Sequence, residues 1–289
     1  QDALNQANGG DEIRLAGGNY GGLTLRNQFS ADVTITSANP DDPASFSSMK
    51  FNGAANITFD GVNFDYSYAS GDSSSFAPFS IYGGSRDITF RNGSITGDND
   101  DSGYPTGHGL YIRGSSDITI DNMEISSWHR GFKIFESQGI TISNSEIFNI
   151  SGDGLQLSET QGLLVENNYF HDFNSDPNSG VHRDMIQVHS AGADSPTTDL
   201  TIRSNTFDVG AGAWTQTIFM RNEEVDRGHA GTEMYYQNIV IENNVIYNAH
   251  THGVSVGETN GLIIRNNSII PVEANLDLVV NQDRTSGTL

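Results

Sequence analysis

The chain of 289 residues contains no cysteine, only 7 prolines and only two lysines. Without cysteine it has neither a disulfide framework nor a thiol nucleophile. Lys+Arg number 14 against 36 Asp+Glu, and the resulting net charge of −22 leaves no basic surface for nucleic acid or an anionic membrane. Apolar runs are only a few residues long, which is far short of a membrane-spanning helix. These absences exclude three classes: thiol-dependent enzymes, nucleic-acid-binding proteins and proteins with transmembrane helices.

An eight-residue phrase recurs along most of the chain. Its copies are ITFDGVNF from Ile57, ITFRNGSI from Ile88, ITIDNMEI from Ile118, ITISNSEI from Ile140, LLVENNYF from Leu163, LTIRSNTF from Leu200, IVIENNVI from Ile239 and LIIRNNSI from Leu262. The shortest steps between copies are 22 and 23 residues, and the longer steps are this period with insertions. Apolar residues at the first, third and eighth positions indicate strands, and Asn at the fifth position in six of the eight copies predicts a ladder of stacked side chains.

A second short strand lies between successive phrases. Its copies are FSIYG from Phe79, GLYIRG from Gly109, GFKIFE from Gly131, GLQLSE from Gly154, MIQVHS from Met185, TIFMRN from Thr217 and GVSVGE from Gly253. Short strands at a fixed period, with no helical periodicity, predict an all-β fold: a right-handed parallel β-helix of about eight or more coils of 22–23 residues.

The repeats also predict the domain organisation. No Pro/Gly linker or change in charge divides the sequence, so we expect one domain over residues 1–289. Residues 1–37 are expected to form an N-terminal cap and the first irregular coils, with a short capping helix over 2–8. The pattern is lost over 281–289, where a link to a further module is expected.

With these repeats the sequence resembles the secreted right-handed β-helix proteins of the pectate-lyase-like superfamily. The similarity is greatest to its alginate lyase, chondroitinase and mannuronan C5-epimerase group, and it covers nearly the whole chain. The resemblance implies a secreted, extracellular protein whose partner is an acidic polysaccharide. We expect a monomer with neither a nucleic-acid nor a membrane partner.

Side chains between the inward-facing apolar residues of the second strand share one outward face. One column of this face comprises Tyr111, Lys133, Gln156, Gln187, Phe219 and Ser255. The next column comprises Arg113, Phe135, Ser158, His189, Arg221 and Gly257. The turn before the strand adds His108, Arg130, Asp153, Asp184, Gln216 and His252. Scarce cations, histidines and aromatic rings gather here in an acidic protein, so we expect a groove for an extended glycan, walled by the long excursions 66–78, 96–107, 171–183, 191–198 and 224–237.

This face has the groups that elimination or epimerisation of a uronic acid requires, namely a carboxylate neutraliser, a base and an acid. His189 is the expected base, because the resemblance aligns it with the His that ends the Tyr-Gly-Phe-Asp-Pro-His motif of the C5-epimerases. The sequence has Asp184 and Gln187 where that motif has Tyr and Asp. Arg221 is expected to neutralise carboxylates together with Lys133 and Arg183, and to matter more than Lys133 because it lies one coil from His189.

We therefore predict a polysaccharide lyase that cleaves a uronate-containing polysaccharide by β-elimination, with alginate as the first substrate to test. The predicted catalytic residues are His189, Arg221, Lys133, Gln187 and Asp184. The predicted substrate-binding residues are Arg183, His182, Tyr111, Arg113, Arg130, Gln156, Phe219, Tyr235, Tyr236 and His252. The acid is left open among Tyr111, Tyr235 and Tyr236, and a mannuronan-type C5-epimerase is an alternative with the same first step.

Two further alternatives belong to other classes. Asp153 and Asp184 occupy equivalent places on consecutive coils, and the segment around His252 is similar to the Gly-His-Gly segment of polygalacturonase-like hydrolases, which would make the protein an inverting glycoside hydrolase. The same two aspartates could simply cap turns through Asx hydrogen bonds. A non-catalytic glycan-binding adhesin would instead use the aromatic rings of Phe135, Phe219 and Trp214 as platforms.

Acidic loops raise the question of a metal. The segments Asp65–Asp72 and Gly97–Tyr104 could supply oxygen ligands to Ca²⁺, although they lack the spacing of an EF-hand. Solvated turns explain the same composition. Calcium is thus the one cofactor that the sequence suggests, and no metal-binding residues can be assigned.

Overall fold

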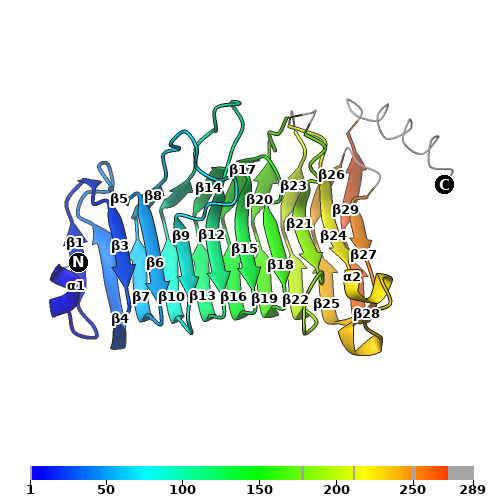
Figure 1. Ribbon diagram of the computed structural model, residues 1–289, viewed down its shortest axis with the longest axis horizontal. Helices are drawn as coiled ribbons and strands as arrows, with labels where there is room; N and C mark the ends of the chain where they lie inside the picture. Colours follow the sequence, from blue (N-terminus) through cyan, green and yellow to red (C-terminus); the bar gives the residue numbers. More distant parts are fainter. Residues whose placement is uncertain (1, 177–178, 211, 249–251, 273–289) are drawn as a thin grey trace.

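The chain winds into a solenoid of three parallel β-sheets, each built from one short strand per coil (Figure 1). In this computed structural model the described residues are 2–176, 179–210, 212–248 and 252–272. Two sheets, here called sheets A and B, have ten strands, and sheet C has nine. Each strand pairs in parallel with the strand one coil away, for example Ile118 with Ile140. The predicted right-handed parallel β-helix is confirmed.

The sheets take their strands in strict rotation. Sheet A comprises β1 (Glu12–Leu15), β4 (Gln28–Ser37), β7 (Ala55–Asp60), β10 (Arg86–Arg91), β13 (Ser116–Asp121), β16 (Gln138–Ser143), β19 (Gln161–Glu166), β22 (Thr198–Arg203), β25 (Tyr236–Glu242) and β28 (Thr259–Arg265). Sheet B comprises β2 (Gly18–Asn19), β5 (Ala44–Phe46), β8 (Asn63–Asp65), β11 (Ser94–Thr96), β14 (Glu124–Trp128), β17 (Glu146–Ile150), β20 (Tyr169–His171), β23 (Thr206–Asp208), β26 (Val245–Asn248) and β29 (Ser268–Pro271). Sheet C comprises β3 (Gly22–Leu25), β6 (Ser48–Asn52), β9 (Phe79–Tyr82), β12 (His108–Arg113), β15 (Arg130–Phe135), β18 (Leu155–Ser158), β21 (Asp184–His189), β24 (Gln216–Arg221) and β27 (Val254–Val256).

The repeated phrase forms a sheet A strand, a tight turn and the start of a sheet B strand. In the copy from Ile118, the apolar positions Ile118, Ile120 and Ile125 are all fully buried. Equivalent residues stack from coil to coil, so the phrase builds a continuous core along the axis. The fully buried apolar residues therefore follow the predicted periodicity.

The asparagine ladder lies one position further along the phrase than predicted. Asn168, Asn205 and Asn244, at the sixth position, are buried and hydrogen-bond in series at 3.0 and 3.1 Å. The fifth-position asparagines have another role: Asn122 and Asn144 both have a φ of 51°, in the left-handed region that Asn tolerates better than most residues. Side-chain stacking at the fifth position occurs where Asn122 bonds to the preceding coil.

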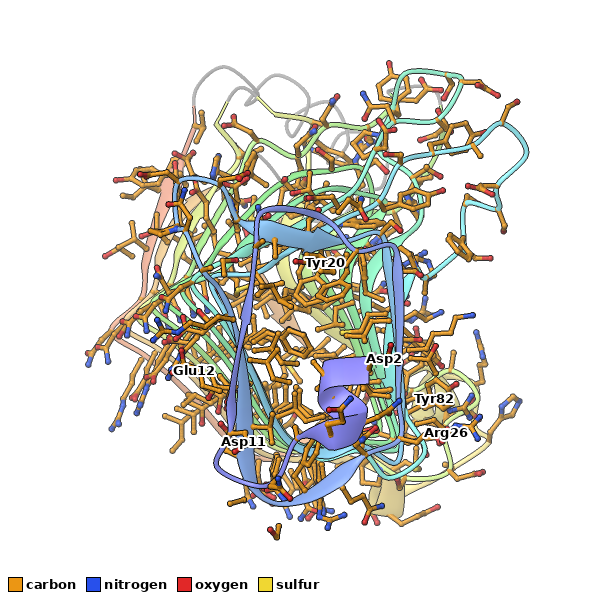
Figure 2. The ribbon with its side chains drawn as sticks, turned by 90° about the vertical axis from the view of Figure 1, so that its left-hand side faces the viewer. Asp2, Asp11, Glu12, Tyr20, Arg26 and Tyr82 are labelled. Atoms are coloured by element: carbon orange, nitrogen blue, oxygen red, sulfur yellow. The ribbon has the colours of Figure 1, made fainter. Side chains whose placement is uncertain are left out.

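A short helix closes the N-terminal end of the solenoid. The helix α1 (Asp2–Gln6) lies across the mouth of the first coil in a view along the axis (Figure 2) and packs the buried Leu4 onto the core. It confirms the capping helix predicted over 2–8. The other helical turns are α2 (Glu223–Asp226) and η1 (Thr232–Met234), between β24 and β25. None of the described helices is long and apolar enough to cross a membrane, and residues 281–289 lie outside the described part of the chain.

Candidate functional site on sheet C

The outer face of sheet C carries the three predicted columns of side chains, which we call the upstream, middle and downstream rows from here on. The middle row runs through Tyr111, Lys133, Gln156, Gln187, Phe219 and Ser255, each paired in register with the next. The downstream row contains Arg113 beside Phe135 and His189 beside Arg221. The upstream row contains His108 beside Arg130 and Asp184 beside Gln216. Long connections enter the sheet before β9, β12 and β21, and in Figure 1 those before β9 and β12 rise above the coils while α2 lies at the opposite edge.

Lys133, Phe135 and His189 form the central group of this face. The Lys133 ammonium lies 5.0 Å from the ring centroid of Phe135 and 6.0 Å from that of Tyr111. The Phe135 and His189 rings meet edge to face at 5.6 Å, across the small side chain of Ser158 on the intervening coil. No carboxylate of a described residue lies within 4.0 Å of the ammonium, and the buried Nε2 of His189 has no hydrogen-bond partner there.

The surroundings favour the uncharged form of His189. Burial lowers the pKa of its imidazole below the usual value, and the nearby Lys133 and Arg130 act in the same direction, while Glu223 opposes them. Burial also lowers the pKa of Lys133, with a further contribution from Arg130. At neutral pH the central group therefore places a neutral imidazole beside a cation that lacks an acidic partner.

The two aspartates of the upstream row are buried, not exposed. Asp153 is 1% exposed and Asp184 is 0% exposed. Arg130 Nε donates to Asp153 Oδ2 at 3.1 Å, and the backbone N–H of Asp184 donates to Asp153 Oδ1 at 3.2 Å. Burial raises the pKa of Asp153 to about 7 and also raises that of Asp184. In this structure both carboxyls are closed off from the groove, which argues against the Asp153/Asp184 hydrolase alternative and against direct contact between Asp184 and the substrate.

A cavity of about 290 Å³ opens next to these acids, between β24 and the residues that precede β21, β24 and β27. Its lining residues are Val181, His182, Arg183, Trp214, Gln216, Phe219 and His252. The Phe219 ring lies 5.1 Å from that of His182 and 6.3 Å from that of His252. Four predicted substrate-binding residues thus come together in one pocket: His182, Arg183, Phe219 and His252.

Arg113 and Arg221 are at the margin of the face, and each is neutralised. Arg113 pairs with Glu136 at 2.6 Å, and Arg221 pairs with Asp226 at 2.7 Å. Both side chains are more than half exposed. The sequence alone favoured Arg221 over Lys133 as the carboxylate neutraliser, because Arg221 lies one coil from His189. Since Asp226 already neutralises Arg221, we now expect Lys133 to matter more.

The three candidate acids are far from equivalent. Tyr236 is fully buried in the core and donates its hydroxyl to the Arg221 carbonyl at 2.6 Å, so its predicted contact with substrate is wrong. Tyr235 follows η1 and precedes the sheet A strand β25, outside the rows. Tyr111 lies in the middle row, paired in register with Lys133. Of the three, Tyr111 is the one that lies next to the central group.

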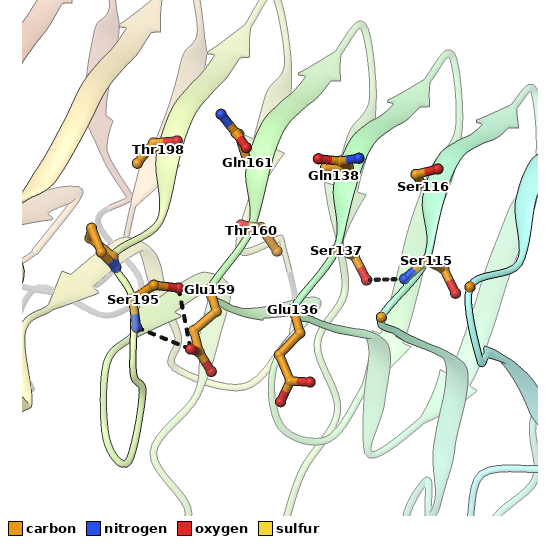
Figure 3. Close-up of a pocket in the computed structure, with 13 residues that line it drawn as sticks. Ser115, Ser116, Glu136, Ser137, Gln138, Glu159, Thr160, Gln161, Ser195 and Thr198 are labelled. Carbon is orange, nitrogen blue, oxygen red and sulfur yellow. Dashed lines mark hydrogen bonds between the residues drawn. The ribbon is translucent and has the colours of Figure 1, made fainter.

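A larger cavity, of about 690 Å³, lies elsewhere, at the corner between sheets C and A (Figure 3). Its lining is mainly hydroxyl, amide and carboxylate groups, including Glu136 and Glu159. Arg113 binds Glu136, and the Ser195 backbone N–H and hydroxyl both donate to Glu159. The lining of this larger cavity contains neither a histidine nor a cationic side chain. We therefore place the chemistry on sheet C, although the cavity there is smaller. The sequence analysis did not predict this cavity. The pattern that could have indicated it is the recurrence of Ser115, Ser137 and Thr160 at one position of successive coils.

The acidic loops satisfy their own carboxylates. Tyr66 donates to Asp72 at 2.6 Å, the Tyr68 backbone N–H donates to Asp98 at 3.0 Å, and Ser70 donates to Asp101. Within the described ranges, no group of three or more His, Asp or Glu side chains could hold a metal ion. These contacts favour the solvated-turn explanation of the loops, and calcium binding stays a prediction.

Three stacked parallel sheets with one strand per coil define a right-handed parallel β-helix protein. The chain belongs to the right-handed β-helix family, since the family model "Right handed beta helix region" matches residues 48–284. No curated protein matches the sequence.

Solved structures share the fold over nearly the whole chain. An alginate lyase from Paenibacillus sp. str. FPU-7 has a TM-score of 0.56 at 16% identity, covering 94% of each chain. Pectate lyase Pel9A has a TM-score of 0.58 at 16% identity, covering 95% of this chain and 71% of its own. PfbA, a surface adhesin of Streptococcus pneumoniae, has a TM-score of 0.58 at 14% identity, covering 93% and 80%. At these identities the likeness concerns the fold alone.

Proposed function

We propose that the protein is a secreted polysaccharide lyase that cleaves a uronate-containing polysaccharide by β-elimination along sheet C, with alginate as the first substrate to test. One observation carries the proposal: the central group holds the Lys133 ammonium without an acidic partner and the His189 imidazole with an unpartnered nitrogen. In a chain of net charge −22, such a group suits an anionic ligand. The alginate lyase and pectate lyase with the same fold support this class of reaction.

The central group supplies the roles that elimination requires. Neutral His189 takes the C5 proton, and Lys133 stabilises the negative charge that spreads onto the sugar carboxylate. The electron pair of the C5–H bond forms the C4=C5 double bond while the C4–O bond breaks. The departing oxygen takes up a proton, for which Tyr111 is the candidate donor; it lies three strands from His189 along sheet C and would have to reach across Phe135. Each residue acts from the exposed side of its strand.

The rest of the middle row suits an extended chain. Gln156 donates to Gln187 at 3.1 Å, which leaves amide groups of both side chains facing the groove. Coils stack about 4.8 Å apart, so a glycan lying along the axis would meet a new side chain with each coil. The row therefore offers repeated hydrogen-bonding positions, as an oligosaccharide needs.

The test is incubation with alginate, polygalacturonate and hyaluronan while the ultraviolet absorbance of an unsaturated uronate is followed. New absorbance that His189→Ala removes is the expected result. Reducing ends without absorbance would indicate hydrolysis, and exchange of the C5 proton with solvent without cleavage would indicate epimerisation. Glycan binding without any reaction would indicate an adhesin. Each of the last three outcomes overturns the lyase proposal.

A further inference from the structure

We propose that the cavity lined by His182, Arg183, Gln216 and Phe219 is a separate subsite for the carboxylate of one sugar residue. In this subsite, buried Asp184 orients the His182 imidazole and stabilises its protonated form. The inference rests on the proposed function and deepens it, because it makes recognition of the glycan depend on pH at a place apart from the central group. Asp184 is then a positioning residue that acts through His182.

The geometry of Asp184 is the first argument. Its carboxylate is fully buried, and neither oxygen has an aligned hydrogen-bond partner among the described residues. His182 Nδ1 nevertheless lies 2.9 Å from Asp184 Oδ2, as a close ion-pair contact. A buried carboxylate without aligned donors is costly unless a cation compensates it. The contact thus favours an imidazolium at His182, whose side chain is 52% exposed at the mouth of the cavity.

Arg183 supplies a second positive group. Its guanidinium donates to the Trp214 carbonyl at 2.9 Å and to the Ser175 hydroxyl, both neutral acceptors. No carboxylate of a described residue lies within 4.0 Å of it. Guanidinium groups form their strongest hydrogen bonds with carboxylates. The Phe219 ring adds an apolar surface against which a sugar ring could pack.

The contact between Gln216 and His182 is the third argument. The amide nitrogen of Gln216 faces His182 Nε2, an arrangement for a neutral ring that accepts. Its amide oxygen is held by His252 Nδ1 at 2.7 Å in this orientation. Because a glutamine amide can turn over, the same contact also serves an imidazolium, whose Nε2–H would donate to the amide oxygen. Gln216 and His252 thus hold the His182 ring at the cavity in either protonation state.

Charged groups around His182 determine the direction of the pH dependence. The contact with Asp184 raises its pKa above the usual value, burial opposes this, Asp153 also raises it and Arg183 lowers it. His252 faces the same Asp184 carboxylate. The imidazolium is thus present below the raised pKa of His182 and is lost as the pH rises through it. Affinity for a carboxylate should fall over the same range.

The test uses the whole protein with D-glucuronate as probe and glucose as its neutral counterpart, observed by NMR of the histidine Cε1–H signals between pH 4 and 8. His182→Gln assigns the His182 signal. We expect glucuronate, and not glucose, to shift the His182 signal at pH 6, and affinity to fall about tenfold or more by pH 8, as expected for loss of a charge-assisted bond. Arg183→Gln should weaken glucuronate binding similarly, whereas Arg203→Gln on sheet A should leave it unchanged.

Asp184→Asn separates positioning from mere structure. It should lower the pH at which His182 titrates and weaken glucuronate binding at pH 7, and acidification should restore the binding. An unchanged His182 titration in this variant, or equal responses to glucuronate and glucose, would overturn the inference. If Asp184→Asn does not fold, the wild-type titration and Arg183→Gln decide the matter. Since the probe is not cleaved, these results stand apart from whether the polymer is eliminated.

Discussion

Sheets A and C treat their exposed charges differently. On sheet A, arginines pair with acids one coil away: Arg91 with Asp60 at 2.8 Å, and Arg203 with Glu166 and Arg265 with Glu242, both at 2.6 Å. Such exposed pairs contribute little to stability, but they leave none of these three arginines without an acidic partner. The outer face of sheet A therefore has the features of a solvated structural surface.

Sheet C leaves comparable groups unsatisfied. Within the described residues, Lys133 and Arg183 have no carboxylate partner, His189 has a buried nitrogen without a hydrogen bond, and Asp184 has two unaligned oxygens. All four lie on sheet C strands β15 and β21 or directly before β21. Because buried unsatisfied polar groups cost stability, their concentration on one sheet of an otherwise well-paired solenoid indicates a role in binding or catalysis.

The strongest test of this contrast is His189→Ala. If the neutral imidazole takes the C5 proton, turnover should fall by about two to four orders of magnitude, the usual contribution of a general base. The ring is only partly buried, so the melting temperature should change little. Initial rates on the substrate found in the polysaccharide panel measure the effect. Retention of more than roughly a tenth of the activity, well above that range, would remove His189 from the mechanism.

A matched pair of cations sharpens the contrast. Lys133→Ala should reduce kcat/KM by about 10- to 100-fold, the worth of one charge-assisted hydrogen bond to a carboxylate. Arg203→Ala, which removes a cation already paired on sheet A, should leave kcat/KM unchanged. Arg221→Ala should lose less than Lys133→Ala, because Asp226 neutralises Arg221. Equal losses for Lys133→Ala and Arg203→Ala would show that general charge, and not the face of sheet C, governs binding.

The parts of the fold that follow a simple period could be predicted from sequence. Inward positions repeat every second residue within a strand and every coil along the chain, so Ile118 and Ile140 had to stack. The same alternation predicted the middle row from Tyr111 to Ser255, which the strand register confirms. We predicted the asparagine ladder one residue too early because asparagine also recurs at the fifth position, where the backbone is left-handed.

The upstream row could not be predicted, because the alternation breaks at the corner of the coil. Connections between sheets B and C cover this row, as the bond from the His108 backbone N–H to the Phe76 carbonyl illustrates. Burial of Asp153 and Asp184 therefore depends on loop conformation, which has no period. The same applies to His182, whose loop brings it onto Asp184, and to Tyr236, which the turn through η1 directs into the core.

The smallest effect on activity is expected for Asp153→Asn, since this buried carboxyl does not reach the groove. The change should instead appear in the pH dependence of stability. The folded pKa of about 7 lies above the usual value of 3.8, so ionisation of Asp153 opposes folding: its stabilising contribution is complete below about pH 4 and is lost as the pH rises to about 7. A difference of about three pKa units corresponds to a change of at most roughly 4 kcal/mol in the free energy of unfolding.

Urea unfolding at pH 4.5, 6 and 8 compares the two proteins. The wild type should lose stability across this range relative to Asp153→Asn, while the pH effects of titratable groups that both proteins share cancel in the comparison. Identical pH profiles would mean that Arg130 keeps Asp153 ionised throughout. Activity decides the remaining question: if Asp153→Asn and Asp184→Asn both abolish cleavage while His189→Ala and Lys133→Ala do not, then the buried carboxyls perform the chemistry. The unsatisfied groups of sheet C would then serve substrate binding and not catalysis.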